Sequence, residues 1–500
     1  MHPSVAVFAL SQTEVADRLP AHEKEPDSVG EVLSRARVAQ VRWAQTPLAE
    51  RLGAIKSLRH SLAEKSAHFS SLISSSLARS EPGTLSAEVL PLAEAAKFLE
   101  RESASILRTK TLTSGSRPFF LRKVSITQRY EPLGVVLIIG PANYPLLLPG
   151  VQALQALVAG NAVLVKPGRG GRVVAQYLAE LAWQAGVPKD LFVVLPEDVQ
   201  TACRMIDEGV DKIVLTGSVE SGRAVLARAA KRLTPAIMEL SGCDAMFILA
   251  GADLDKAAKA LAFGLSLNGS ATCIAPRRVF IDRSNQQEFV RFLSQSLRGA
   301  APVHLSRSIT ALVEELFQDA LRSGAHLMQG DYVAGSSMRP TVLVDALPSM
   351  RVASADVFAP LCCLLPFDSE SEAIAAATQC PYALGATVFG PEQQARKFAA
   401  FVPAGVVVVN DMIVPTADPR LTFGGKGASG FGKTRGAEGL LQMTFLKSIV
   451  VQREMRLRHL EPEHPRAEQL FRSYIAVVHG EGFKGRAVAM RNLLSAAIGK

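Results

Sequence analysis

The amino-acid sequence predicts an α/β protein with two α/β domains in tandem, and two stretches of the chain support this prediction. In the first, short apolar runs that end in glycine or proline alternate with helical segments such as RVVAQYLAELAWQAG, and the same alternation returns after Leu240. Apolar runs joined by crossover helices are typical of parallel strands buried on both faces. The expected strands are 134–141, 161–167, 191–196 and 212–217 in the first series, and 244–251, 277–282, 340–345 and 404–411 in the second.

Three further segments complete the expected organisation. Residues 28–110 carry apolar residues at spacings of three and four, which predicts helices. Residues 115–129 and 444–452 alternate polar and apolar residues, and we expect them to pair as strands of an arm or an interface. The chain after Gln452 is polar and ends in a stretch that predicts a short basic amphipathic helix.

Composition and charge narrow the class of protein. The 500 residues are 48% hydrophobic and 20% charged, which argues against disorder and favours a large buried core. The six cysteines form no CxxC pair, so we expect no metal site and a reducing, cytoplasmic location. The net charge of +9 comes without a zinc finger or a long Lys/Arg run, and it favours anionic small molecules over nucleic acid.

Neither the N-terminus nor the longest uncharged stretch predicts insertion into a membrane. The N-terminal segment lacks the basic region and the cleavage site of a signal peptide. Residues 132–165 carry no charge, but prolines, asparagines and glutamines interrupt them, so they are expected to form buried core.

A strand-to-helix turn in KIVLTGSVESGR is the first candidate for ligand binding. Gly217 and Gly222 flank a turn at which a helix is expected to open with Ser218. Backbone N–H groups at a helix N-terminus favour a phosphate. A tight turn without any ligand explains the same residues, and the GxGxxG dinucleotide motif is absent.

Three residues are candidates for nucleophilic catalysis, and each has a simpler alternative. Cys273, in SATCIAP, offers a thiolate nucleophile or a buried structural thiol. Glu239, in MELSG, offers a general base or a surface carboxylate. Asn143, in PANYP, follows an expected strand, where its amide can donate to an oxyanion or form an ordinary turn.

The order of these motifs indicates a family. EPLGVVLIIGPANYPL, AGNAVLVKP, LTGSVESGR, MELSG, TCIAPRRVF, DVFAP, TFGGKGASGFG and FLKS follow one another between residues 131 and 448. This ordered set resembles the aldehyde dehydrogenase superfamily. The resemblance implies two Rossmann-like α/β domains, one for the cofactor and one for catalysis, with a bridging β oligomerisation arm. It also implies oxidation of a small-molecule aldehyde to a carboxylic acid with NAD or NADP.

The resemblance also implies roles for individual residues. Cys273 would form a thiohemiacetal and then a thioester with the aldehyde, Asn143 would hold the oxyanion, and Glu239 would activate the hydrolytic water. Tyr144 and Phe423 would line the substrate channel. The implied cofactor-binding residues are Lys166, Arg169, Gly217, Ser218, Gly222, Leu240, Asp356 and Phe358.

Several residues depart from the family pattern. The segment KPGR has Arg169 where a glutamate commonly holds the ribose 2′-hydroxyl, with Arg172 nearby, and this favours NADP because arginine is a bidentate phosphate partner. A solvated loop arginine is the alternative. Asp356 is one methylene shorter than the usual glutamate, and Ser241 replaces a usual glycine. Thr434 lies where some members carry a second glutamate, so Glu239 would act alone.

The resemblance also sets domain boundaries and partners. We expect a homodimer or homotetramer built through the arm, and no association with a membrane surface. Two alternatives stay open: transfer of the thioester to coenzyme A, and a non-catalytic relative that acts as a binding or scaffold protein. The expected parts are a nucleotide-binding domain over 1–112 and 130–240, a catalytic domain over 241–430, an arm over 113–129 and 431–452, and a C-terminal extension over 453–500.

Overall fold

The computed structural model describes residues 28–77, 79–113, 115–329, 337–454 and 457–498. The expected lack of a signal peptide concerns residues 1–27, which lie outside the described residues. The chain has two compact units. The first comprises the residues up to Arg108 together with Tyr130–Leu446, and the second comprises Thr109–Arg129 and Lys447–Lys500.

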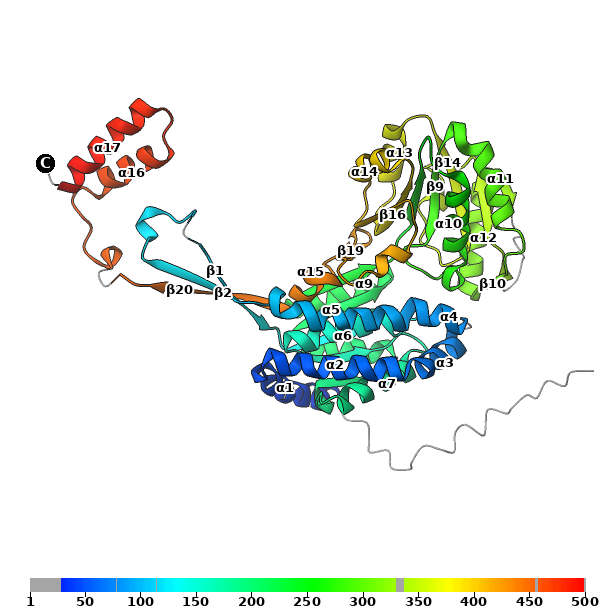
Figure 1. The fold of residues 1–500 in the computed structure, drawn as a ribbon, viewed down its shortest axis with the longest axis horizontal. Helices are drawn as coiled ribbons and strands as arrows, with labels where there is room; N and C mark the ends of the chain where they lie inside the picture. The colour runs from blue at the N-terminus through cyan, green and yellow to red at the C-terminus, as the bar shows by residue number, and fades with distance from the viewer. Residues whose placement is uncertain (1–27, 78, 114, 330–336, 455–456, 499–500) are drawn as a thin grey trace, which may run out of the picture. The chain divides into compact units, whose positions relative to one another are not determined.

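The first unit begins with helices, as the spacing of apolar residues predicts. A capping box starts the first helix: the Ser28 hydroxyl accepts from the Glu31 N–H, and the Glu31 carboxylate accepts from the Ser28 N–H at 2.8 Å. The second helix packs against the fifth, as Figure 1 shows. These helices are α1 Val29–Gln45, α2 Leu48–Glu64, α3 Ser66–Leu77, α4 Glu81–Thr84 and α5 Leu90–Ile106, with a π-helical turn over Leu85–Val89 before α5.

The first series of expected strands forms a six-stranded sheet in the order β19-β7-β6-β3-β4-β5. All neighbours are parallel except β19, which pairs antiparallel with β7 at one edge. The strands are β3 Val135–Ile139, β4 Ala162–Lys166, β5 Phe192–Val194, β6 Lys212–Gly217, β7 Ala236–Leu240 and β19 Gly430–Phe431. The helices that accompany them are α6 Leu147–Ala159, α7 Arg172–Gln184, α8 Val199–Glu208, α9 Val219–Ala229 and α15 Gly436–Leu441.

Every residue of β3 and β4 is buried, which explains why these strands have uninterrupted apolar sequences. The sheet order places β3 between β4 and β6. Because the three strands are parallel, the loops that follow them meet at one edge of the sheet, which is where doubly wound folds bind ligands.

The second series forms a seven-stranded sheet in the order β11-β13-β14-β9-β8-β16-β17, parallel except for β11 at one edge. The two sheets confirm the predicted α/β class. The strands are β8 Asp244–Ile248, β9 Pro276–Asp282, β11 His326–Gln329, β13 Thr341–Val344, β14 Leu361–Phe367, β16 Gly385–Phe389 and β17 Val406–Val409. The helices are α10 Leu254–Ser266, α11 Gln286–Ser296, α12 Arg307–Arg322, α13 Glu370–Thr378 and α14 Glu392–Ala399.

Four short strands form two small antiparallel sheets in the first unit. The pairs are β10 Val303–His304 with β12 Ser337–Met338, and β15 Tyr382–Ala383 with β18 Lys426–Gly427. Residues 430–441, which follow β18, contribute β19 and α15 next to the six-stranded sheet. The segment 431–452 was expected as one arm, and in the structure its long strand begins only at Thr444.

The second unit contains most of a three-stranded sheet and a helical hairpin. The sheet order β1-β2-β20 confirms that the two β-like segments pair. None of the helices among the described residues is both long and apolar enough to cross a bilayer. The elements are β1 Lys110–Thr111, β2 Val124–Pro132, β20 Thr444–Gln452, and the mutually packed helices α16 Ala467–His479 and α17 Phe483–Ile498, the second of which was expected as a basic helix.

Candidate active site

Three loops converge at the carboxyl edge of β3, β4 and β6. The loop after β3 carries Asn143, the loop after β4 carries Arg169, and the turn after β6 carries Ser218. The first two loops touch, because a Cβ at Gly168 would collide with the main chain of Pro141 and Ala142. Glycine is therefore required at this close approach of two backbones.

The turn after β6 opens a helix, as the sequence predicts. The Ser218 hydroxyl accepts from the Ser221 N–H at 3.2 Å and caps α9. Helix α9 lies close to the end of β7, since a Cβ at Gly222 would come within 2.8 Å of the Leu240 side chain. The two glycines and Ser218 thus leave the N-terminus of α9 at the sheet edge, where its N–H groups can receive a phosphate.

Lys166 ends β4 at the same edge and is 9% exposed. Burial lowers the pKa of its ammonium group, and Glu197 and Asp198 oppose that shift. The Glu197 carboxylate also accepts from the N–H groups of Gly170 and Arg172 at 2.9 and 2.8 Å. The Arg169 side chain is exposed next to this loop. A lysine, a hydroxyl-capped helix N-terminus and an exposed arginine are a donor set that suits an anionic dinucleotide.

Asn143 connects the loop after β3 to the loop that precedes Cys273. Its side-chain amide donates to the carbonyl oxygen of Ala271 at 2.7 Å. Next to it, the Tyr144 hydroxyl and the Thr272 hydroxyl lie 2.8 Å apart, and burial raises the pKa of Tyr144 to about 12. The structure therefore brings Asn143 and the cysteine loop together, although 130 positions separate Asn143 from Cys273 in the chain.

The cysteine loop has an unusual backbone. Asn268, Gly269 and Ser270 all have positive φ, at 52°, 59° and 63°, so two non-glycine residues adopt the left-handed conformation. Such residues cost about 1–3 kcal/mol each and persist only where the surroundings hold them. Arg277 is one such restraint, since its guanidinium donates to the Ser270 hydroxyl, the Ser270 carbonyl and the Ala359 carbonyl at 2.6–2.7 Å.

Cys273 is partly buried in a small apolar cluster that includes Ile274 and Phe423. Burial is the main cause that raises the pKa of its thiol far above the ordinary value, followed by the nearby carboxyl groups of Glu239 and Asp244. Arg435 opposes this rise. In this state the sulfur is a protonated thiol at neutral pH, so a neighbouring base must accept its proton before it can act as a nucleophile.

Glu239 lies at the end of β7 and is 3% exposed. Its Oε2 accepts from the Thr434 hydroxyl at 3.2 Å, and its buried Oε1 has no hydrogen-bond partner among the described residues. Burial raises the pKa of this carboxyl group, and Arg435 and Thr434 oppose the rise. A buried carboxylate with a free oxygen and a raised pKa has the properties of a general base near neutral pH.

Arg435 is a further residue of this site, and its sequence did not point to it. The residue has a φ of 60° and places its guanidinium 4.3 Å from the centre of the Phe423 ring. Its positive charge lowers the pKa values of Glu239 and Cys273, and so opposes the effect of burial on both groups. It lies in the glycine-rich loop of TFGGKGASGFGKTRG, where no periodic pattern separates a buried arginine from an exposed one.

The other expected site residues occupy the same unit. The Asp356 carboxyl is partly buried, which raises its pKa, and the nearby Ser241 side chain opposes that rise. Phe358 is partly buried two residues further on, and Phe423 is 1% exposed. Asp356 and Ser241, two departures from the family pattern, are therefore near each other. The Ser241 hydroxyl donates to the carbonyl oxygen of Gly217 at 3.4 Å, which joins the end of β7 to the end of β6.

Comparisons with known proteins agree with this arrangement. The sequence model described as the aldehyde dehydrogenase family matches residues 4–449. The chain belongs to the aldehyde dehydrogenase family. The predicted family is therefore confirmed.

Relatives of this aldehyde dehydrogenase cover nearly its whole length. A putative succinate-semialdehyde dehydrogenase [NADP(+)] from Mycolicibacterium smegmatis is 30% identical, over 91% of this chain and 94% of its own. A 4,4'-diapolycopene aldehyde oxidase from Methylomonas sp is 29% identical, over 91% of this chain and 88% of its own length. The crystal structure of a Mycobacterium tuberculosis aldehyde dehydrogenase complexed with NAD+ is 26% identical, with a TM-score of 0.78 over 86% of this chain and 92% of that chain.

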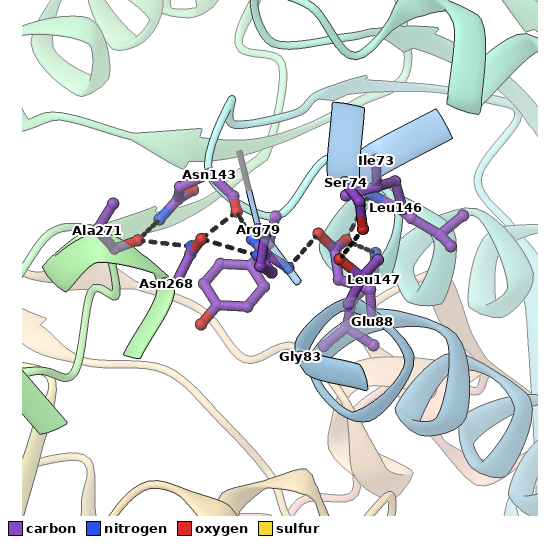
Figure 2. Close-up of polar contacts among 12 residues, drawn as sticks. Ile73, Ser74, Arg79, Gly83, Glu88, Asn143, Leu146, Leu147, Asn268 and Ala271 are labelled. Carbon is purple, nitrogen blue, oxygen red and sulfur yellow. Dashed lines mark hydrogen bonds and ion pairs between the residues drawn. The ribbon is translucent and has the colours of Figure 1, made fainter. Parts of the chain in front are cut away.

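A buried ion pair holds the loops that carry Asn143 and Cys273 in this aldehyde dehydrogenase, and the sequence did not suggest it. Arg79 donates to the main-chain oxygen of Asn143 at 2.7 Å and to the Asn268 side chain at 2.9 Å, as Figure 2 shows. Asn268 in turn donates to the carbonyls of Asn143 and Ala271. One guanidinium therefore joins the loop that carries Asn143 to the loop that carries Cys273.

The partner of Arg79 is Glu88, whose side chain is fully buried. Its Oε1 lies 2.9 Å from Arg79, and its Oε2 accepts from the N–H groups of Leu146 and Leu147 at 2.8 and 2.9 Å. Burial raises the pKa of Glu88, and Arg79 and the two N–H groups oppose the rise. The pair satisfies the first N–H groups at the start of α6, which follows Asn143.

We expect Arg79→Leu to lower the free energy of unfolding by about 3–5 kcal/mol, because it leaves the Glu88 carboxylate buried without its cation. Urea unfolding followed by circular dichroism measures the change. Without Arg79, the pKa of Glu88 in the folded state rises further above its value in the unfolded state. Ionisation of Glu88 then favours the unfolded state, so the loss of unfolding free energy should grow as the pH increases from 5 to 8. Arg396→Leu, which breaks an exposed pair with Glu392, is the control and should cost less than about 1 kcal/mol. An equal loss in both variants would contradict the assignment.

Proposed function

We propose that this protein oxidises an aldehyde to a carboxylic acid with NAD or NADP, through a covalent intermediate on Cys273. The observation that carries this proposal is the association of three groups from distant segments. The Asn143 amide donates to the carbonyl oxygen of Ala271, in the loop that holds Cys273. The buried Glu239 carboxyl is near enough to the Cys273 thiol to raise its pKa. A nucleophile, an oxyanion donor and a base with a raised pKa are what acyl transfer through sulfur requires.

The chemistry follows from these groups. Glu239 accepts the thiol proton at its free Oε1, and the Cys273 sulfur adds to the aldehyde carbon to form a thiohemiacetal. Asn143 has a second amide hydrogen beyond the one bonded to Ala271, and this hydrogen donates to the oxyanion. Bound NAD or NADP supplies the acceptor for the hydride, which leaves a thioester on the sulfur. Glu239 releases the thiol proton to solvent and, as a carboxylate again, removes a proton from water. The water oxygen attacks the thioester carbon, and the C–S bond breaks to release the acid and the Cys273 thiolate.

The cofactor is proposed from the residues at the sheet edge. Lys166 and Ser218, with the N-terminus of α9, would hold the ribose and the pyrophosphate. The exposed Arg169 side chain supports a 2′-phosphate and hence NADP. The names of the relatives support both cofactors, since the M. smegmatis protein is named for NADP(+) and the M. tuberculosis structure contains NAD+.

A panel of aldehydes tests the proposal directly. Each aldehyde is incubated with NAD+ or NADP+, and reduced cofactor is followed at 340 nm (about 10 to 1,000 µM substrate, the usual KM range). We expect one molecule of acid to form for each molecule of cofactor reduced. The KM for NADP+ should be lower than the KM for NAD+. Addition of coenzyme A should not change the product. Acyl-CoA in place of the acid would refute hydrolysis, and no reduction with any aldehyde would refute the function.

We also propose that the protein forms a homodimer or homotetramer through the sheet of the second unit and is located in the cytoplasm. Strand β20 is an edge of this sheet, and its residues Ile449, Val450 and Val451 are 40%, 60% and 46% exposed. An exposed apolar edge strand supports pairing with a second copy. All six cysteines are free thiols, which supports a reducing compartment.

A further inference from the structure

We propose that the second unit docks on the surface of a membrane that contains anionic lipid. The inference goes beyond the proposed oxidation of an aldehyde and does not depend on it. It comes from the division of charge between the two units, and from apolar side chains that are exposed among the positive charges. It reverses the sequence-based expectation of no membrane surface, because only the structure divides the chain into these units.

The second unit carries the whole positive net charge of the protein. Its two segments, Thr109–Arg129 and Lys447–Lys500, contain 15 of the 55 basic residues and 5 of the 46 acidic residues, so their formal net charge is +10. The first unit holds the other 40 basic and 41 acidic residues, for a net charge of −1. A compact unit with such an excess of positive charge attracts an anionic partner.

Helix α17 has an exposed apolar face between cations. Large apolar residues recur at spacings of seven and four, so they lie along one side of the helix. With exposed fractions of 89%, 43%, 54% and 70%, these residues are Phe483, Met490, Leu494 and Ile498. Lys484 and Arg491 flank this face on one side and Arg486 on the other, and α17 contains no acidic residue. An apolar helix face bordered by lysine and arginine is typical of helices that lie in the interface of a membrane.

Helix α16, which packs against α17, also exposes its large apolar residues (Figure 1). Phe471, Ile475 and Val478 follow one another at spacings of four and three, and they are 68%, 57% and 43% exposed. The buried residues of the two helices are small, namely Ala467, Ser473, Ala489 and Ala496. The hairpin therefore buries small side chains and leaves large apolar ones outside, which marks a surface for an apolar partner.

The turn between β1 and β2 adds exposed aromatic rings to the same unit. Phe119 and Phe120 are 68% and 64% exposed, within the sequence RPFFLRK, which has three basic residues and no acidic one. The Phe120 ring meets the Tyr474 ring of α16 edge-on, with 5.9 Å between the ring centres, so the turn packs against the helical hairpin. Exposed phenylalanine next to arginine and lysine suits the boundary between lipid headgroups and acyl chains.

Anionic lipid fits this unit better than nucleic acid or a second copy of the chain. Phosphates of nucleic acid suit the cations, but they offer nothing to exposed leucine, isoleucine and methionine side chains. A second copy brings the same positive charge to the same face, whereas pairing through β20 is not opposed, because Lys447 is the one charged residue of that strand. A bilayer supplies acyl chains and negative headgroups together. The helices lie on the bilayer, since none of those described is long and apolar enough to span it.

Flotation of the full-length protein with lipid vesicles tests the proposal. The protein should float with vesicles made of equal parts of phosphatidylglycerol and phosphatidylcholine, and only weakly with vesicles of phosphatidylcholine alone. A rise in salt from about 0.1 M to about 1 M shortens the Debye length from about 10 Å to about 3 Å and should weaken binding at least about 10-fold.

Two double variants of α17 separate the charges from the apolar face. Lys484→Gln with Arg491→Gln should weaken binding to the anionic vesicles about 5- to 30-fold, because each cation near an anionic surface contributes to affinity. Phe483→Ser with Leu494→Ser should weaken it at least about 10-fold, because the apolar side chains leave water on binding. All four side chains are exposed, so the fold should be unaffected.

Lys231→Gln with Leu233→Ser is the matched control, since it makes the same changes at exposed positions of the first unit, and it should bind vesicles as the wild type does. Absence of wild-type binding to the anionic vesicles, or an equal loss in the control, overturns the proposal. Tighter binding to a DNA duplex that is insensitive to Phe483→Ser with Leu494→Ser assigns the unit to nucleic acid instead. A lower oligomer mass of this variant in light scattering without vesicles assigns the face to a second copy. Flotation requires no turnover, so its result is independent of aldehyde oxidation.

Discussion

Replacement of Cys273 by alanine is expected to abolish steady-state aldehyde oxidation, with a fall in kcat of at least about 10⁴-fold. The sulfur is the atom to which the aldehyde carbon is bonded throughout the proposed cycle, and the alanine side chain offers no other nucleophile. The Asn143 amide and the bound cofactor cannot replace this bond. Reduced cofactor measured at 340 nm gives the rate, and mass spectrometry of the quenched wild-type protein should show the acyl group on the Cys273 peptide.

Cys203→Ala is the matched control, because Cys203 is a partly buried free thiol on α8, in the part of the first unit that carries the six-stranded sheet. This variant should keep the wild-type rate. Turnover by Cys273→Ala above about one part in a hundred of the wild-type rate would contradict the role of the sulfur.

The reactivity of Cys273 toward alkylating reagents should depend on pH in a diagnostic way. Burial and the carboxyl groups of Glu239 and Asp244 raise the pKa of the thiol, so the thiolate is scarce at pH 7. The rate of labelling by iodoacetamide in the resting protein should therefore keep rising above pH 8.5, where an ordinary cysteine begins to level off (reference pKa about 8.5). A plateau below that pH would show that another group activates the sulfur before substrate binds.

Glu239→Gln is expected to slow the steady-state rate by about 10²–10⁴-fold, the usual contribution of a general base. Hydrolysis of the thioester needs a base for water, and the amide of glutamine accepts no proton near neutral pH. The first turnover should be slowed as well, because Glu239 also accepts the Cys273 thiol proton before the sulfur adds to the aldehyde. Stopped-flow absorbance at 340 nm separates the burst from the steady state.

The pH profile gives a second readout of Glu239. Burial raises the pKa of this carboxyl group. As the pH is lowered, the wild-type rate should therefore begin to fall at a higher pH than it would with an exposed glutamate as the base, whose pKa is about 4.3. Thr434→Val removes the 3.2 Å hydrogen bond that stabilises the ionised form, so this fall should move to still higher pH. A burst of wild-type rate and size in Glu239→Gln would contradict the role of Glu239 as the acceptor of the thiol proton.

Much of the fold was predictable because buried parallel strands have a clear local pattern. The runs 134–141, 161–167 and 212–217 correspond to β3, β4 and β6, and each ends at the loop or turn that carries site residues. The strands β14 and β16 were not expected, although both are interior strands of the seven-stranded sheet. Both follow turns within segments that have few polar residues, so their boundaries are not marked in the sequence as clearly as those of β3.

The candidate nucleophile, base and oxyanion donor were also predictable, but only through the order of motifs in the chain. Cys273, Glu239 and Asn143 each had an ordinary structural explanation when considered alone. Their hydrogen bonds and charge interactions then link the loops that the sequence could only list in order. The assignment of Arg169 to a 2′-phosphate depends on an exposed side chain and stays a prediction.

What the sequence determined by itself was the α/β class, the helical N-terminal region and the identity of the groups with the right chemistry, because periodicity and motif order are properties of neighbouring residues. The tertiary structure alone decided that Arg79 with Glu88 holds two loops, and that a partly buried Arg435 lies over the Phe423 ring with Glu239 and Cys273 near it. The physical reason is that burial and polar contacts join residues far apart in the chain, as in the bond between Arg79 and Asn268, which are 189 positions apart. An arginine in a loop has the same local sequence whether it is solvated or buried, and only its distant neighbours distinguish the two.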